Sequence, residues 1–208
     1  MKIVELLIDE LDKLSGVDTV ALVEEPAIEA DFYAFNEVDV EDTIALQLIK
    51  LALKEEMDSK KKLEETKSPS KFSFALQDDQ QIIVGPLMIP NKLILRVDEN
   101  DEPYYIFFSK DTIRQVAYKM MKNKFIDALN TEHDPDQPVN GHLLESWIVE
   151  DSMNDKQNVY GFNFEEGSWM GMYKVESSET WSKIKAGDIK GFSVEGFFTD
   201  RFVQAKAQ

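Results

Sequence analysis

Short β-prone runs separated by turn residues are the feature that most restricts how this chain can fold. In the second part of the chain, the segments predicted as strands are residues 72–76, 80–88, 92–97, 104–108, 139–149, 168–175 and 190–198. Two helices are expected among them: residues 110–129, with Ser109 as the N-cap, and residues 177–186, ended by Gly187. Many short strands with a few interspersed helices predict an α+β domain built on a β-barrel or a strongly bent sheet.

The N-terminal region has a different pattern. Residues 1–9 and 16–23 are predicted strands, and the second is ended by a Glu-Glu-Pro sequence, because proline stops ladder pairing. Residues 41–65 form the strongest predicted helix, with acids in the first turn and lysines near the end. We therefore divide the chain into N-terminal strands (residues 1–35), a charged helix with its linker (36–70), a main domain (71–200) and a C-terminal tail (201–208).

Composition narrows the class of function. The chain has 208 residues, 43% hydrophobic and 30% charged, with a formal net charge of −17. Such a charge disfavours nucleic acid as a partner, because phosphates would be repelled. There is no cysteine, which excludes disulfides and thiolate chemistry and favours a cytosolic compartment. No apolar run approaches the ~20 residues of a membrane span, so no membrane association is expected. No pattern calls for a cofactor.

A serine within the last predicted strand is the first candidate for chemistry. Ser193 lies in the sequence KGFSVEGF (residues 190–197), with a glycine two residues before it and another three after. Glycines allow close approach of a substrate backbone, which an exposed nucleophile on a strand needs. A serine also needs a base, and His133 and His142 are the two histidines available. Glu195 lies on the same strand face as Ser193 and could bias its electrostatics, although a solvated carboxylate is an equally good interpretation.

Four stretches together resemble the capsid-maturation (prohead) proteases of tailed phages, in particular the phage serine protease group related to herpesvirus assemblin. They are IVGPLMIP (residues 83–90), YIFFS (105–109), Glu132-His133 with LESWIV (144–149), and WSKIKAGD (181–188) with GFSVEG (191–196). The resemblance covers about residues 80–200. It implies an assemblin-like fold, with Ser193 as nucleophile and His133 as base. His142 has no match in the family pattern.

The third catalytic group is the point at which the family pattern is incomplete. Phage relatives place an acid on a strand after the serine, in a sequence similar to VALVEEPA, which here occupies residues 20–27. We hypothesise that this strand is circularly permuted, so that the N-terminal region supplies a barrel strand. The family acid would then fall at Thr19, which makes its neighbour Asp18 a candidate if the strand bulges. Glu145 is the competing acid, and a serine–histidine dyad without a third group is the remaining alternative.

The resemblance implies a serine endopeptidase that cuts the scaffold and capsid precursor proteins of an assembling phage head, and itself. Its location would be the bacterial host cytoplasm, inside the prohead. Herpesvirus relatives are activated by dimerisation, so a homodimer is a further expectation. The alternative is a non-catalytic head or scaffold component with the same fold.

A metal hydrolase is a rival from another class. His133, Asp134, Asp136, His142 and Glu145 have the side-chain types that could bind a divalent ion. Asp and Pro over residues 134–138 are also ordinary turn residues, which is the simpler interpretation.

Overall fold

The computed structural model describes residues 2–35 and 80–203. Of these, residues 2–34 and 81–203 belong to one compact unit, which contains both Ser193 and His133. The helix predicted over residues 41–65, the linker after it and the strand predicted over residues 72–76 lie outside the described residues.

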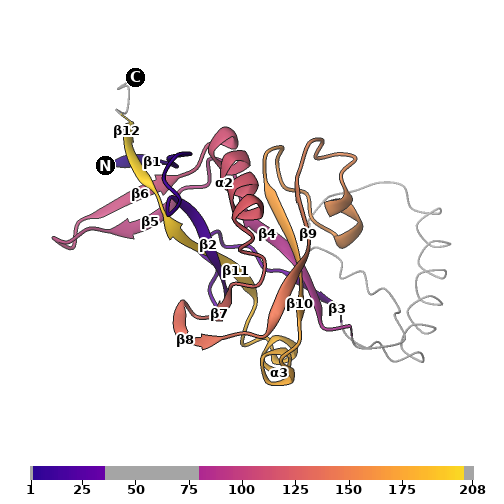
Figure 1. Ribbon diagram of the computed structural model, residues 1–208. Helices are drawn as coiled ribbons and strands as arrows, with labels where there is room; N and C mark the ends of the chain where they lie inside the picture. Colours follow the sequence, from indigo (N-terminus) through magenta and orange to yellow (C-terminus); the bar gives the residue numbers. More distant parts are fainter. Residues whose placement is uncertain (1, 36–79, 204–208) are drawn as a thin grey trace, which may run out of the picture. The chain divides into compact units, whose positions relative to one another are not determined.

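Twelve strands and two α-helices make up the described residues (Figure 1). The strands are β1 (Ile3–Leu7), β2 (Gly16–Val23), β3 (Tyr33–Phe35), β4 (Ile82–Met88), β5 (Ile94–Val97), β6 (Pro103–Phe107), β7 (Leu129–Thr131), β8 (Asp134–Pro138), β9 (Gly141–Ile148), β10 (Trp169–Val175), β11 (Gly191–Phe197) and β12 (Thr199–Val203). The helices are α2 (Lys110–Asn123) and α3 (Ser178–Ala186), with a 3-10 helix η1 (Lys156–Tyr160). This mostly β arrangement is compatible with the predicted α+β class.

The described strands form three four-stranded sheets and no closed barrel, which corrects the barrel expectation. Their strand orders are β12-β1-β6-β5, β3-β4-β10-β9 and β11-β2-β7-β8. Side chains, rather than a continuous backbone ladder, join the sheets. The ring of Phe192 on β11 lies 5.2 Å from that of Phe32 and 5.3 Å from that of Tyr173 on β10. Buried residues of all three sheets contribute to one hydrophobic core, so closure by backbone pairing is not needed to exclude water.

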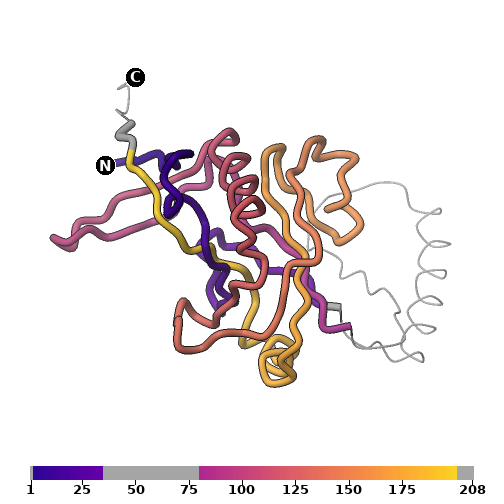
Figure 2. The backbone as a smooth tube through the Cα atoms, in the orientation of Figure 1, coloured from indigo at the N-terminus to yellow at the C-terminus, as the bar shows by residue number. Residues whose placement is uncertain are grey.

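The N-terminal strand β2 lies at the centre of the sheet that carries the candidate residues (Figure 1). It pairs antiparallel with β11, where Ala21 is opposite Ser193, and parallel with β7, where Ala21 is opposite Asn130. Figure 2 shows the indigo N-terminal trace running beside the yellow C-terminal one. The predicted pairing of this strand near His133 and Ser193 is therefore confirmed. That the strand is permuted relative to other family members stays a hypothesis.

The two helices differ in how well the sequence predicted them. Helix α3 begins one residue after the predicted start and ends at the predicted residue, since the Ser177 side chain accepts from Thr180 N–H as the N-cap and Gly187 ends it in a left-handed conformation. Helix α2 begins after Ser109 as predicted but ends at Asn123, with Lys124 as its C-cap, and not at residue 129. Lys124 has φ +62°, and its N–H bonds to the last-turn carbonyls, which ends the helix without a glycine.

Candidate active site

Ser193 lies in the middle of β11 and is only 6% exposed. It opens onto a cavity of about 400 Å³, which His133 and Glu195 also line. The flanking glycines serve the chain's own packing rather than the approach of a substrate. A Cβ at Gly196 would collide with the carbonyl oxygen of Gly16, and one at Gly191 would lie 2.6 Å from the Pro26 side chain. The exposed nucleophile expected from the sequence is thus a buried one at the wall of a cavity.

His133 is part of a two-residue turn between β7 and β8. Thr131 pairs with Asp134 across the hairpin, and the two residues between them, Glu132 and His133, have φ values of +53° and +60°. Two positive φ values in succession define the type I′ turn, which matches the twist of a hairpin but favours Asn and Gly. A residue with a Cβ loses about 1–2 kcal/mol in this conformation. Strain of this kind persists where the surrounding structure fixes it, and it is frequent at functional sites.

Hydrogen bonds to the end of β2 hold the turn of Glu132 and His133 in place. The backbone N–H of Glu132 donates to the carbonyl of Leu22 at 3.1 Å. The side chain of Glu132 accepts from the backbone N–H of Glu24, with 2.6 Å between Oε1 and N. Backbone and side chain of Glu132 therefore attach the turn to the same strand that pairs with the Ser193 strand. The position of the His133 ring is set by a segment more than 100 residues earlier in the sequence.

Glu195 is the carboxylate next to the histidine. Its Oε1 lies 3.2 Å from His133 Nδ1, with the two side chains 30% and 44% exposed. The same oxygen accepts a hydrogen bond from Asn130 Nδ2 at 2.7 Å. A carboxylate at Nδ1 holds the proton on that nitrogen and leaves Nε2 free to accept the proton of a serine. Glu195 is two residues after Ser193 on one strand, so the two side chains lie on the same face of β11, and both residues line the cavity.

Asn130 is a residue that sequence reasoning missed. It is 5% exposed on β7, and its Oδ1 is buried without a hydrogen-bond partner among the described residues. Burying a hydrogen-bond acceptor without a partner is unfavourable, so an asparagine at this position needs a structural or functional reason. The hydrogen bond from its Nδ2 to Glu195 is such a reason, because the amide orients the carboxylate that faces His133. No sequence signal marked Asn130, which directly follows the predicted helix.

The two carboxylates proposed from the sequence as the third group lie elsewhere. Asp18 sits on β2 at a bulge, where Thr19 is opposite Glu195 and Val17 is opposite Gly196. The bulge on which its candidacy depended is thus present, yet Asp18 is not among the described residues that line the cavity. Glu145 lies on β9 in another sheet and forms an ion pair with Lys156. The carboxylate that the structure brings to His133 is Glu195.

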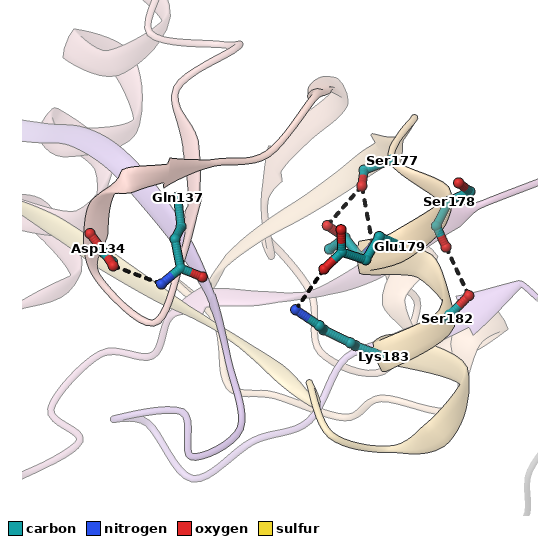
Figure 3. Close-up of polar contacts among 8 residues, drawn as sticks. Asp134, Gln137, Ser177, Ser178, Glu179, Ser182 and Lys183 are labelled. Carbon is teal, nitrogen blue, oxygen red and sulfur yellow. Dashed lines mark hydrogen bonds and ion pairs between the residues drawn. The ribbon is translucent and has the colours of Figure 1, made fainter.

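The residues of the metal alternative are dispersed in the same way. Asp134 accepts hydrogen bonds from Gln137 Nε2 (Figure 3) and from the backbone N–H of Asp136, and the first is 2.7 Å long. These bonds, the Gln137 one first, hold the pKa of Asp134 below its ordinary value. His142, on β9, is opposite Lys174 of β10. Over residues 2–35 and 80–203, no three His, Asp or Glu side chains are grouped as a metal site requires.

The remaining wall of the cavity is apolar. Its side chains come from β1, β4, β5, β6, β11, residues adjacent to these strands and the segment after β2. Arg96 is the one cation among the described residues that line it, and Arg96 is exposed on β5. In the described part of the chain, no helix is long and apolar enough to cross a membrane.

Comparison with known protein families gives a match that covers the main domain. The family model described as "Putative phage serine protease XkdF" matches residues 71–201. No curated protein matches the chain, and no solved structure does. The matched range includes Ser193, His133, Glu195 and Asn130, whereas β1 and β2 lie outside it. Because the match spans more than half of the chain, the protein belongs to this family of phage serine proteases.

Proposed function

We propose that the protein is a serine endopeptidase in which Ser193 is the nucleophile, His133 the general base and Glu195 the group that orients the imidazole. The observation that carries this assignment is the shared cavity. Ser193, His133 and Glu195 all line it, and Glu195 is 3.2 Å from His133 Nδ1. Membership of a serine protease family supports the reaction class.

The proposed cycle follows from these positions. Ser193 Oγ bonds to the peptide carbonyl carbon while its proton passes to His133 Nε2. Glu195 stabilises the imidazolium that forms, through the contact at Nδ1. The imidazolium then protonates the leaving amine as the C–N bond breaks, which leaves an acyl ester on Ser193. Water attacks this ester, gives a proton to His133, and Ser193 regains its proton as the carboxylic acid leaves.

The natural substrates that we propose are the scaffold and major capsid precursor of a phage head, together with the protease itself, inside the assembling prohead. Support comes from the family match and from the resemblance of residues 80–200 to capsid-maturation proteases. A homodimer during activation belongs to the same proposal.

The test compares the full-length protein with its Ser193→Ala variant. Wild type should react with a fluorophosphonate and gain the mass of one phosphonyl group at Ser193, and it should cleave co-expressed scaffold protein. Ser193→Ala should lose both activities, with a loss of about 10⁶-fold in rate, while its thermal unfolding stays within a few degrees of wild type. His133→Ala should be nearly as inactive.

His142→Ala is the matched control, because that histidine lies on β9 and is not among the described residues that line the cavity. We expect it to retain activity. Cleavage by Ser193→Ala would contradict the assignment of the nucleophile. A wild-type protein that neither reacts nor cleaves would instead favour the non-catalytic head component.

A further inference from the structure

The cavity beside Ser193 contains more apolar surface than catalysis itself requires. Eight of its lining side chains belong to the buried core, and six of these lie in or next to strands of the two sheets without Ser193, each at most 8% exposed: Leu6, Leu87, Met88, Ile94, Ile106 and Phe108. They come from four strands, or the residue next to one, in the two sheets that do not carry Ser193. Core side chains normally contact one another without leaving space for a ligand. Here they surround about 400 Å³.

That volume lies within the range of pockets that bind ligands, roughly 300–1,000 Å³. The chemistry of the wall restricts what can occupy it. A charged side chain would lose its hydration against this wall, where the charged residues are Arg96, on the exposed β5, and Glu195, which already contacts His133. An apolar side chain would gain by leaving water. The wall therefore selects a large aliphatic or aromatic group.

The position of Ser193 at the cavity indicates which residue of the substrate the apolar side chain belongs to. Ser193 itself lines the cavity, and the carbon that a serine attacks is bonded to the Cα of the residue on the acyl side of the scissile bond. The side chain of that residue leaves the peptide closest to the nucleophile. We propose that the cavity is the specificity pocket of the protease and receives a large apolar side chain, of the size of Leu, Met or Phe, on the acyl side of the cleaved bond. This proposal rests on the protease function proposed above.

Ala27 provides a way to alter the pocket without touching the catalytic side chains. It lies after the end of β2, lines the cavity and is partly buried. In an Ala27→Leu variant the added atoms reduce the space for a substrate side chain. Ala30, three residues later, is also a partly buried alanine packed against the core, but it is not among the described lining residues. Ala30→Leu is therefore the matched control for the general effect of enlarging an alanine in this segment.

The experiment measures the rate at which Ser193 of the full chain is modified by tripeptidyl diphenyl phosphonates. The probes are identical except for the residue nearest phosphorus, which is Phe, Leu, Ala, Asp or Lys. We expect the Phe and Leu probes to react at least tenfold faster than Asp and Lys, consistent with the discrimination that apolar pockets achieve. Ala27→Leu should slow the Phe probe at least tenfold but change the Ala probe less than threefold. Ala30→Leu should leave the order of the probes unchanged.

The small fluorophosphonate separates failure of this inference from failure of the protease assignment. If the fluorophosphonate modifies Ser193 but the five peptidyl probes react equally, or the charged ones react fastest, the pocket proposal is wrong and the cavity is an internal packing gap. If the fluorophosphonate also fails, the nucleophile assignment is wrong. Loss of Phe selectivity in Ala30→Leu, equal to that in Ala27→Leu, would likewise overturn the proposal.

Discussion

Replacing Asn130 by alanine should separate catalysis from stability. The substitution removes the 2.7 Å hydrogen bond to Glu195, the residue that faces His133 Nδ1. A hydrogen bond to a charged group contributes about 1.5–3 kcal/mol, and the 30% exposure of the Glu195 side chain places this one near the lower value. A loss of about 1.4 kcal/mol in transition-state stabilisation is a factor of ten in rate. We therefore expect kcat to fall about tenfold, with KM nearly unchanged, because Asn130 is not among the described residues that line the cavity.

Stability should respond differently. The same substitution removes Asn130 Oδ1, whose unpartnered burial costs about 1–3 kcal/mol. This relief opposes the loss of the bond to Glu195, so the free energy of unfolding should change by less than about 1 kcal/mol. Hydrolysis of a fluorogenic peptide and urea denaturation on the same preparation measure the two quantities. Asn130→Asp keeps the shape but puts a second carboxylate beside Glu195, and it should lower kcat further at neutral pH.

Asn140→Ala is the control, since Asn140 is exposed in the turn between β8 and β9. It should leave both quantities unchanged. Two results would refute the reasoning. One is an Asn130→Ala variant with unaltered kcat. The other is a loss of activity matched by an equal loss of stability, which would show a structural role alone.

Three further predictions concern the carboxylate, the N-terminal strands and a glycine. Glu195→Gln should lower kcat at least 100-fold without unfolding the protein, because a neutral amide cannot stabilise the imidazolium. Unchanged kinetics would show that another group, or none, orients the His133 ring. Deleting residues 1–30 should give an insoluble or inactive protein, because β7 and β11 lose the strand between them, and a soluble, active product would contradict this. Gly196→Ala should lower the free energy of unfolding by several kcal/mol, measured by thermal unfolding, because the new Cβ collides with the Gly16 carbonyl. Gly161→Ala, which has open space around it, should lower it by about 1 kcal/mol because of the strain at a φ of +82°. Equal losses of stability in the two variants would exclude the collision.

Strand and helix bounds were predictable where the local signals were complete. Strand β2 has the predicted bounds because its β-branched run ends before Glu-Glu-Pro. Helix α3 was predictable because both of its cap residues, Ser177 and Gly187, are of types that favour these positions. The sequence did not predict strands β7 and β8. Strand β7 has three residues, which are too few to show an alternating pattern. The prolines of β8 are typical of turns as well as of edge strands. The early end of α2 at a left-handed lysine had no sequence signal.

The candidate site was predictable only in part. Sequence reasoning selected Ser193 and His133 from a family pattern, and the structure places both at one cavity. Glu195 was recognised as sharing the face of Ser193, but its contact with His133 depends on where the β7–β8 turn lies relative to β11. Strand β2 lies between β7 and β11 in the sheet and so fixes their relative position, although it is distant from both in sequence. Pairing across such distances is a property of the assembled sheet and cannot be derived from local periodicity.

The central position of β2 also affects when during synthesis the site can form. Its partners β7 and β11 emerge from the ribosome long after it, and β11 is almost the last of the described strands to do so. Contacts of such high sequence separation form slowly, because long segments must be ordered before the ladder stabilises them. Until β11 pairs with β2, the nascent chain has a serine and a histidine without a shared cavity. A protease of this family would thus remain inactive on the ribosome until β11 has been synthesised, because of the order of its strands.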